Sequence, residues 1–476
     1  MSAHPLEEII HPHSIAVVGA SDSGRGGGFV APLLEQEYKG KIYPVNPKHS
    51  EIMGLKAYAS VKDIPGVVDY VISSVPASQV LGMLDDCSRK GVRAVHLFTA
   101  RFSETGRKEA AELEQEILRQ AKKYNIRLIG PNCLGLYYPR ENIAFHDGFP
   151  REPGSVGLAS QSGQAVGEIV QTAAARGIRF SKGISYGNAL DFNECDYLEY
   201  FIQDPETSMI MMYIEGVRDG RRFFDLLRRA TATKPVIIVK GGRGESGTRA
   251  TASHTASLAG SMQVWETMIN QAGAVSASNL EELVDFSTAF YFLPPITGRR
   301  VGVAGGSGGS SVLAADECEE AGLNVVPLPA ELREELKNKG SLIWDWIGNP
   351  ADMSIRIDRD WDTGDMLEIM SRYPDFDLLI AFVRGHYHPG QDQLSAGHYL
   401  KQYRLNDLND KPLLAVMEYM SRSNDDDDDD SRMFRKMMDE VRDKLIEARV
   451  PIYPHIKRAA RAASKLINYY EHGRNG

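Results

Sequence analysis

The stretch that decides the fold lies near the N-terminus, where residues 15–29 read IAVVGASDSGRGGGF. A short apolar run over 15–18 leads into a turn of small residues and then into a helical pattern, which is typical of a βα unit. Gly19, Ala20 and Ser21 leave backbone N–H groups open to a phosphate at the head of a helix. The GxGxxG dinucleotide fingerprint is absent, so a purely structural tight turn remains the alternative.

The same alternation of apolar runs and helical patterns continues along the chain, which predicts an α/β fold of parallel sheets covered by helices. Further strands are expected at 42–45, 71–75, 94–98, 127–129, 156–159, 209–214, 236–240, 301–304, 378–383 and 413–417. Helices are expected at 78–90, 104–124, 315–321, 432–448 and 456–469.

Two turn-rich breaks divide this pattern, FPREPGSVG at 149–157 and PPITGRR at 294–300. A chain of 476 residues has room for about three domains at a typical size of about 150 residues each. We therefore predict domains at 1–148, 149–296 and 297–476.

Composition narrows the class of protein. The chain has 54 Lys and Arg against 64 Asp and Glu, a net charge of −10, which argues against a nucleic-acid partner. Its four cysteines lie far apart without a CxxC pair, so neither a disulfide framework nor a zinc site is expected. No leader and no apolar run of about 18 residues is visible, which predicts a cytoplasmic protein without membrane contact. His386 and His388 lack a third ligand, and Asp425–Asp430 reads as a solvated loop, so no metal site is predicted.

Polar and small residues follow several strands of the first predicted sheet. Asn46, Pro47 and Lys48 come after the second strand, and Val75 with Pro76 follows the third. Asn132, in GPNCLG, follows the last strand of this set. Ligands of open α/β sheets bind outside the carboxyl ends of the strands, so these residues are expected to meet at one crevice. An exposed lysine such as Lys48 is also explained as a solvated surface residue.

Two further signals fall in the second predicted domain. The sequence ASQSG places Ser160, Gln161, Ser162 and Gly163 between a strand and a helix, which predicts an anion site. A serine that only caps the helix explains the same pattern.

The other signal is a small-residue loop over 239–260 that holds one histidine, His254, and neutral imidazole is a competent nucleophile. Glu215 ends the strand MIMMYIEG, and its carboxylate could hold one ring nitrogen so that the other attacks. Each residue also has a bland explanation, His254 as a loop residue and Glu215 as a polar strand terminus.

Taken together, these segments resemble the α subunit of ADP-forming acetyl-CoA synthetases, in the NDP-forming acyl-CoA synthetase and succinyl-CoA synthetase superfamily. The motifs that carry the resemblance are IAVVGAS, IYPVNPK, GPNCLG, ASQSG, SYGNALD, YIEG and SHTASLAG, in family order from about residue 14 to 352. The resemblance implies a Rossmann-like CoA-binding domain followed by two flavodoxin-like ligase domains. It also implies that the crevice binds CoA.

The resemblance assigns His254 as the phosphorylated histidine, Glu215 as its acidic partner, and Ser160–Gly163 as the helix start that holds the phosphoryl group. The implied reaction interconverts acyl-CoA, phosphate and ADP with a small carboxylic acid, CoA and ATP, through acyl phosphate and phosphohistidine. A partner β subunit with an ATP-grasp module would bind ADP or ATP with Mg²⁺, in an α2β2 assembly. The alternative is a CoA-binding regulatory protein without turnover.

Two positions depart from the family pattern. Family members commonly read AGF where this chain has Ala100, Arg101 and Phe102, and SHTG where it has Ala256. Arg101 places a cation near the expected CoA crevice. It would either strengthen phosphate binding or alter the position of the thiol.

Overall fold

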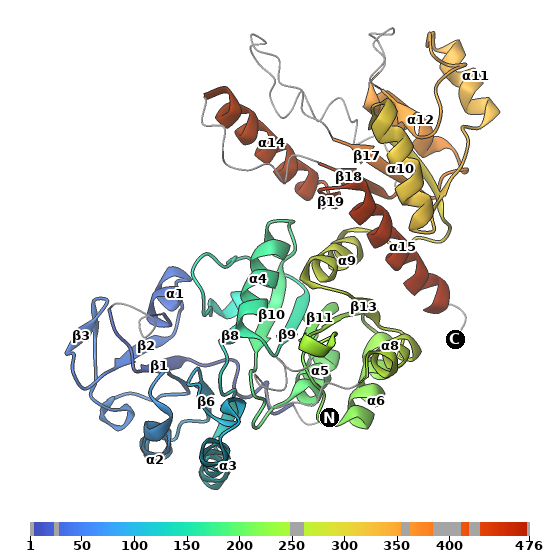
Figure 1. Ribbon diagram of the computed structural model, residues 1–476. Coiled ribbons are helices and arrows are strands. Elements are labelled where there is room, and N and C mark those ends of the chain that lie inside the picture. The colour runs from blue at the N-terminus through green and yellow to red at the C-terminus, as the bar shows by residue number, and fades with distance from the viewer. Residues whose placement is uncertain are drawn as a thin grey trace. The chain divides into compact units, whose positions relative to one another are not determined.

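The computed structural model describes residues 4–22, 28–247, 261–353, 362–383, 411–417 and 429–473. The chain forms two compact units, Met1–Leu283 and Val284–Gly476. The first unit holds two large sheets, drawn in blue and in green in Figure 1, and the second holds one, drawn in yellow to red. The predicted α/β fold with parallel sheets is confirmed.

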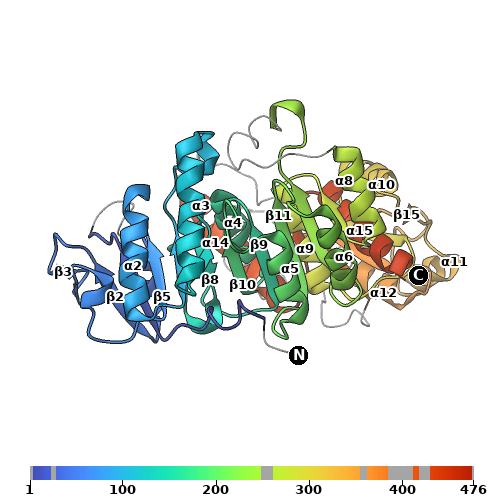
Figure 2. The same ribbon diagram turned by 90° about the horizontal axis from the view of Figure 1, so that it is seen from below.

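The first sheet has the strand order β2-β1-β5-β6-β7, and all of its strands run parallel. Its strands are β1 (Ser14–Val18), β2 (Lys41–Val45), β5 (Tyr70–Ser73), β6 (Ala94–Leu97) and β7 (Arg127–Ile129). A small hairpin, β3 (Glu51–Ile52) and β4 (Leu55–Lys56), lies outside it. Helices α2 (Val80–Lys90) and α3 (Lys108–Lys123) lie side by side on one face (Figure 2), and α1 (Val30–Glu35) lies on the other.

The second sheet has the order β13-β12-β11-β9-β10-β8. Its strands are β8 (Gly135–Tyr137), β9 (Val156–Ser160), β10 (Phe180–Ser185), β11 (Met209–Ile214), β12 (Val236–Lys240) and β13 (Val275–Ala277). Only β8 is antiparallel to its neighbour. The helices are α4 (Gly163–Ala174), α5 (Glu194–Gln203), α6 (Gly220–Thr231), α8 (Met262–Gln271) and α9 (Leu280–Phe292), the last of which crosses into the second unit.

Strand β10 has no counterpart among the predicted strands. Its sequence, FSKGIS, contains too few apolar residues to stand out, yet all six residues are buried. The pattern is broken by Lys182, which is nevertheless buried. Its side chain is 1% exposed, and its Nζ lies 2.9 Å from Asp204 Oδ2 and 2.6 Å from Glu206 Oε2. A buried ammonium is tolerated when carboxylates neutralise it. Because these partners lie more than twenty residues further on, the strand is invisible to a local pattern.

The third sheet has the order β15-β14-β17-β18-β19, with β16 beside β14. Its strands are β14 (Arg300–Gly306), β15 (Asn324–Val325), β16 (Ala351–Asp352), β17 (Leu378–Phe382), β18 (Leu413–Val416) and β19 (Ile452–Tyr453). Its helices are α10 (Gly308–Glu320), α11 (Ala330–Asn338), α12 (Thr363–Arg372), α14 (Asp429–Glu447) and α15 (Ile456–Gly473). Helix α10 starts seven residues before the predicted 315, because Ser307 and Ser310 form a capping box at its start.

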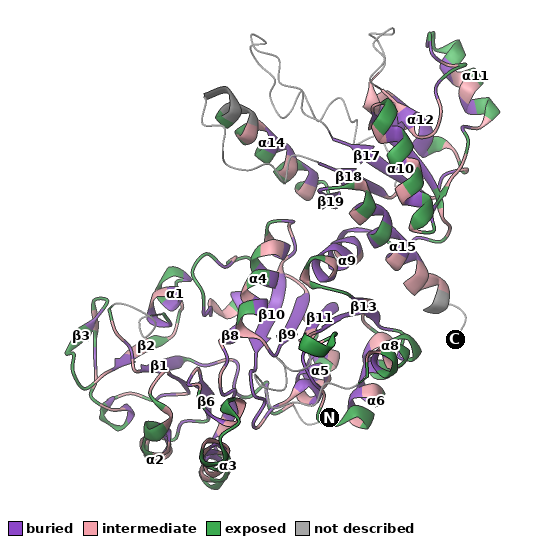
Figure 3. Ribbon diagram, in the orientation of Figure 1, coloured by how far each residue is buried: buried purple, intermediate pink, exposed green. Residues whose placement is uncertain are grey.

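The three sheets share one topology. If the five main parallel strands of each are counted in chain order, every sheet has the order 2-1-3-4-5. This is the doubly wound arrangement in which ligands bind at the point where the strand order reverses, between the first and third strands. Figure 3 shows that the strands are buried and that the outer faces of the helices are exposed. The reversal points are therefore β1/β5, β9/β11 and β14/β17.

Candidate functional site

The strongest candidate site lies at the β9/β11 reversal point of the second sheet. Ser160 is the last residue of β9 and pairs with Tyr213 on β11, so Glu215 leaves the sheet immediately beside the ASQSG segment. The side chain of Gln161 joins the two segments, because its Oε1 accepts the backbone N–H groups of Glu215 and Gly216, the latter at 3.0 Å. The structure thus brings together the residues that the sequence placed in an anion site and the predicted acidic partner.

The two serine hydroxyls of the ASQSG segment form hydrogen bonds with nearby backbone groups. Ser162 is the N-cap of α4, and its Oγ accepts the N–H of Ala165 at 3.2 Å. Ser160 Oγ donates to the carbonyl of Ser162 at 2.7 Å. The N–H of Gln161 is taken by the carbonyl of Tyr213 at 3.1 Å. The backbone N–H groups in the first turn of a helix have no intrahelical partner, and in α4 this turn begins at Gly163.

Glu215 is 7% exposed and is held from several sides. Tyr213 donates its hydroxyl to Glu215 Oε1 at 3.2 Å, and Lys240 Nζ donates to the main-chain carbonyl of Glu215 at 2.6 Å. Its other carboxylate oxygen, Oε2, is buried and has no hydrogen-bond partner within the described ranges. A carboxylate fixed in this way can accept a hydrogen bond from an imidazole and orient its ring.

Two residues at this site were missed by the sequence reasoning. Tyr213 lies on β11, two positions before Glu215, and the extended period of two places both side chains on one face. Lys240 pairs in register with Ile214, and burial lowers the pKa of its ammonium. The two-residue period of a strand could have identified Tyr213 from the sequence. Lys240 could be identified only from the register of β11 against β12.

His254 lies outside the described residues, because the structure describes nothing between 247 and 261. The described chain runs on from β12 to residue 247 and resumes at residue 261, just before α8. Gly241 packs closely here, because a Cβ at this position would lie 2.7 Å from the hydroxyl of Tyr213 and 3.2 Å from Cγ of Glu215. The described chain therefore leaves β12 at Gly241, against the side chain of Glu215.

A second group of predicted residues meets at the β1/β5 reversal point of the first sheet. Gly19 follows β1 with φ +88°, and a Cβ there would lie 2.7 Å from the Oγ of Ser74, the residue before Val75. Asn46 reaches across from the end of β2, donating from Nδ2 to the carbonyl of Ala20 at 2.8 Å and accepting the N–H of Lys48 at 2.9 Å. Ser21, Pro47 and Pro76 adjoin these residues in sequence and are also described.

Asn132 joins the same edge through the end of β6. Its N–H donates to the carbonyl of Thr99 at 3.0 Å, and the hydroxyl of Thr99 donates to the carbonyl of Val75 at 2.7 Å. Asn132 Nδ2 lies 3.4 Å from Asn188 Oδ1, on the loop that follows β10 of the second sheet. The crevice of the first sheet therefore connects through two asparagines to the second sheet.

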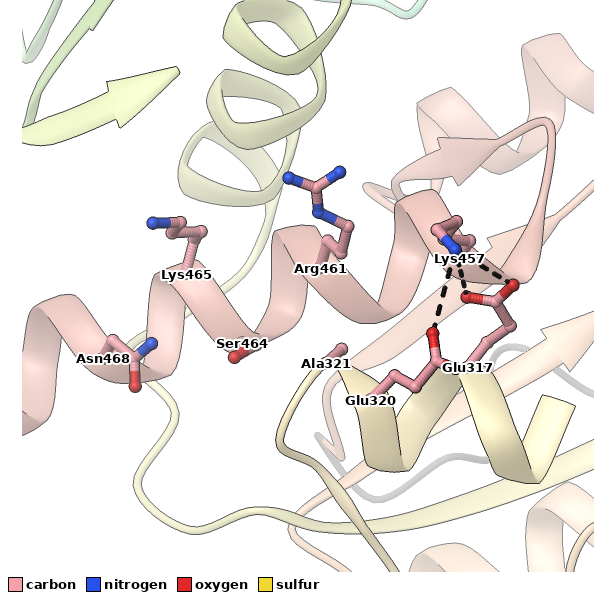
Figure 4. Close-up of a pocket in the computed structure, with 8 residues that line it drawn as sticks. All are labelled: Glu317, Glu320, Ala321, Lys457, Arg461, Ser464, Lys465 and Asn468. Atoms are coloured by element: carbon pink, nitrogen blue, oxygen red, sulfur yellow. Dashed lines mark hydrogen bonds and ion pairs between the residues drawn. The ribbon is translucent and has the colours of Figure 1, made fainter. Parts of the chain in front are cut away.

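A cavity of about 360 Å³ lies elsewhere, between α10 and α15 of the second unit (Figure 4). Lys457 lies between Glu317 and Glu320, with Nζ at 3.1 and 3.9 Å from their carboxylates. The cavity contains none of the residues predicted for the site, and Lys457 is already neutralised. We assign no ligand to it.

Neither a cluster of metal ligands nor a membrane-spanning helix is found among the described residues. Across those ranges no cluster of three His, Cys, Asp or Glu side chains is placed to hold a metal ion. His386 and His388 lie outside them, as do Asp425–Asp428. No described helix is both long and apolar enough to cross a membrane.

Comparison with known proteins defines the class. A family model for a CoA binding domain matches residues 13–139, and one for a succinyl-CoA ligase like flavodoxin domain matches residues 153–290. These matches cover the first and second sheets, including both reversal points described above.

Individual relatives narrow the class further. The chain is 38% identical over 475 residues to the α subunit of the ADP-forming acetate–CoA ligase I of Pyrococcus furiosus, covering 98% of this chain and 97% of that one. It is 40% identical over 337 residues, 70% of its length, to the ADP-forming acetate–CoA ligase of Methanocaldococcus jannaschii, of which it spans about half, 47%. The chain belongs to the family of ADP-forming acetate–CoA ligase α subunits.

A solved structure agrees. Acetyl-coenzyme A synthetase 1 of Ca. Korarchaeum cryptofilum, in complex with phosphate and ADP, superposes with a TM-score of 0.78 at 31% identity. The match covers 99% of this chain and 97% of that one. The resemblance read from the sequence motifs is thereby confirmed.

Proposed function

We propose that this chain is the α subunit of an acid–thiol ligase that interconverts acyl-CoA, phosphate and ADP with a carboxylic acid, CoA and ATP. The observation that carries the proposal is the buried Oε2 of Glu215, which has no hydrogen-bond partner within the described ranges, on a residue whose main chain is bound by Gln161 just before α4. That pairing supplies an orienting base and an anion-binding helix end at one reversal point. The family of the chain supports the same conclusion.

The first step would take place at the crevice of the first sheet. A phosphate oxygen attacks the thioester carbonyl, the C–S bond breaks, and CoA leaves as the thiol while acyl phosphate forms. The residues that would hold CoA are Gly19, Ala20, Ser21, Asn46, Pro47, Lys48, Val75, Pro76 and Asn132. The proposal is supported by the close approach of Gly19 to Ser74, which holds the turn after β1 against the segment that contains Val75 and Pro76.

The later steps would take place at the second sheet. The imidazole of His254 attacks the phosphorus of acyl phosphate, the P–O bond to the acyl group breaks, and the carboxylic acid leaves. ADP then takes the phosphoryl group, which restores the imidazole and yields ATP. Glu215 Oε2 would hold one ring nitrogen, and Ser160, Gln161, Ser162 and Gly163 form the segment that would stabilise the phosphoryl group. Because the N–H of Gln161 is occupied, we assign the direct contact to the first turn of α4.

We propose an ATP-grasp β subunit as the partner of this chain, in an α2β2 assembly, with ADP or ATP and Mg²⁺ bound there. The name "subunit alpha" of the Pyrococcus furiosus relative implies a second subunit in that enzyme. We also propose that each sheet with its helices forms one domain, bounded at 148 and 296. The alternative function, a CoA-binding regulator without turnover, has no specific contact in its favour.

The test is mass spectrometry of the intact protein and its peptides after incubation with acetyl-CoA and phosphate, under alkaline handling that preserves phosphohistidine. The chain is incubated with and without its co-purified partner. We expect one added phosphoryl group on His254 and none in His254→Ala. A panel of other acyl-CoAs follows a negative result with acetyl-CoA. Absence of phosphohistidine across that panel, with CoA binding intact, would favour the regulatory alternative.

A further inference from the structure

The turn that follows β6 contains an arginine in a backbone conformation that favours glycine. Arg101 has φ +80°, in the left-handed region, where a side chain costs on the order of 1 kcal/mol or more. Glycine would adopt this conformation without strain. A strained position that keeps a long charged side chain points to a use for that side chain.

The backbone of this turn is firmly held. The carboxylate of Glu104 accepts the N–H groups of Arg101 and of Phe102, the latter at 3.0 Å. Asn188 Nδ2 donates to the same carboxylate at 2.7 Å, and the Phe102 side chain is fully buried. The turn is therefore a rigid support, and the position of the Arg101 Cα is fixed by contacts from both sheets of the first unit.

The turn also lies at the rim of the proposed CoA crevice. Thr99, two residues before Arg101, donates its hydroxyl to Val75 and accepts the N–H of Asn132. Both of those residues belong to the crevice. Arg101 itself is exposed, and its guanidinium has no hydrogen-bond or ion-pair partner within the described ranges. The guanidinium of Arg101 therefore lies at the rim of a site that is proposed to bind CoA, a highly anionic ligand.

We propose that Arg101 binds an anionic group of the CoA thioester, either a phosphate of the CoA moiety or a carboxylate carried by the acyl group. The guanidinium suits both, because its planar fork forms two parallel hydrogen bonds to carboxylate or phosphate oxygens. The proposal rests on the proposed CoA crevice and adds to it a residue that selects the ligand. If the acyl carboxylate is the target, the substrate class is dicarboxylic rather than monocarboxylic.

The experiment is isothermal titration calorimetry on the full chain with four probes: CoA, 3′-dephospho-CoA, acetyl-CoA and succinyl-CoA. The variants are Arg101→Gly, which suits the positive φ, and Arg101→Gln, which keeps a side chain but removes the charge. Arg93→Gln is the matched control, because Arg93 is an exposed arginine just before the opposite, amino end of β6. We expect both Arg101 variants to weaken binding about tenfold or more for the probes that carry the recognised group.

The probes separate the two sources of the anion. Recognition of an acyl carboxylate weakens succinyl-CoA alone, whereas recognition of a CoA phosphate weakens CoA, acetyl-CoA and succinyl-CoA alike. If a CoA phosphate is recognised, 3′-dephospho-CoA tells which one. The Arg101 variants bind this probe more weakly than wild type does if the pyrophosphate is the target, and equally well if the 3′-phosphate is the target. Either pattern supports the proposal, and Arg93→Gln should match the wild type.

The failures are also separable. If wild type binds all four probes and both Arg101 variants bind them within twofold of wild type, Arg101 has no such role. If wild type binds none of them, the proposed CoA crevice itself is wrong. Arg101→Gly should keep or raise the melting temperature, because glycine relieves the backbone strain, so a loss of binding in this variant is not a loss of folding.

Discussion

Gln161 accepts the backbone N–H of Gly216 at 3.0 Å, so the residue after β9 fixes the segment after β11. The same oxygen accepts the N–H of Glu215. Gln161 is 6% exposed, so neither hydrogen bond can be replaced easily by water. A residue that the sequence placed among phosphate ligands therefore positions the acidic residue of the site through its side chain.

Replacing Gln161 by alanine should destabilise the protein and weaken its activity together. Two buried N–H groups would lose their acceptor, at a cost of about 1–3 kcal/mol each. Urea denaturation should show a loss of about 2–5 kcal/mol in the free energy of unfolding. Gln164→Ala is the control, because Gln164 is exposed in the first turn of α4 and should change stability by less than about 0.5 kcal/mol. Equal stability of the two variants would contradict the assigned role of Gln161.

Glu215→Gln should remove phosphoryl transfer while leaving the fold intact. The amide oxygen can still accept the Tyr213 hydroxyl, but the neutral group no longer stabilises a positive imidazole, so phosphorylation should slow by about 100-fold or more. The measurement is the rate of ³²P incorporation from labelled phosphate in the presence of acyl-CoA. Glu168→Gln, on the exposed face of α4, should react at the wild-type rate. Wild-type phosphorylation in Glu215→Gln would refute the role of this carboxylate.

Gly187→Ala should separate the loop after β10 from the loop that holds Asn132. An added Cβ would lie 2.1 Å from the carbonyl oxygen of Pro131 and 2.4 Å from that of Asn132, and φ is +53°. Backbone atoms cannot give way as side chains do, so we expect a loss of about 2 kcal/mol or more. Gly167→Ala, inside α4 with nothing within 4 Å of its new Cβ, should instead stabilise by about 0.5–1 kcal/mol. Thermal melts of the two variants should move in opposite directions.

His96 should make the protein sensitive to acid. Its ring is 1% exposed and Nε2 donates to the carbonyl of Cys133 at 3.0 Å, while burial lowers the pKa of His96 to about 4. In the unfolded chain the pKa is about 6.5, so the unfolded state gains a proton that the folded state does not bind. This contribution is fully present above pH 6.5 and is lost as the pH falls toward 4, by about 3 kcal/mol in total.

The check is urea denaturation of wild type and His96→Gln between pH 7 and pH 4. Carboxylates contribute to acid unfolding in both proteins, so the difference between them isolates the histidine. His96→Gln should lose less stability on acidification than wild type does. His13→Gln, at an exposed position, should follow the wild-type curve. Parallel curves for wild type and His96→Gln would show that His96 is not the titrating group.

Much of the fold was readable because the central strands are continuous apolar runs. MIMMYI and VIIVK became β11 and β12 with the predicted bounds. FSKGIS did not stand out, because the burial of Lys182 depends on Asp204 and Glu206, whose spatial position no local pattern contains. The glycine- and serine-rich start of α10 lies outside the predicted 315–321 for a similar reason, since its helix depends on capping rather than on apolar periodicity.

The sequence predicts which strand ends the candidate residues follow better than it predicts their contacts. Strand ends of a doubly wound sheet converge, so topology brings the segment at Ser160 beside the segment at Glu215, and the segment at Gly19 beside the segment at Asn46. The inward role of Gln161 did not follow, because it depends on the register of β9 against β11. The role of His254 stays a prediction, since that residue lies outside the described ranges.

The position of strand β8 limits where two related chains can be joined into a folded chimaera. It follows the last strand of the first sheet by only a few residues, yet it forms the antiparallel edge of the second sheet through its pairing with β10. A chimaera joined at residue 148 would import a foreign β8 and set it against a native β10. A crossover between Ile129 and Gly135 would keep β8 with its own neighbour. Natural recombination that preserves folding in this family is therefore expected to favour junctions upstream of β8.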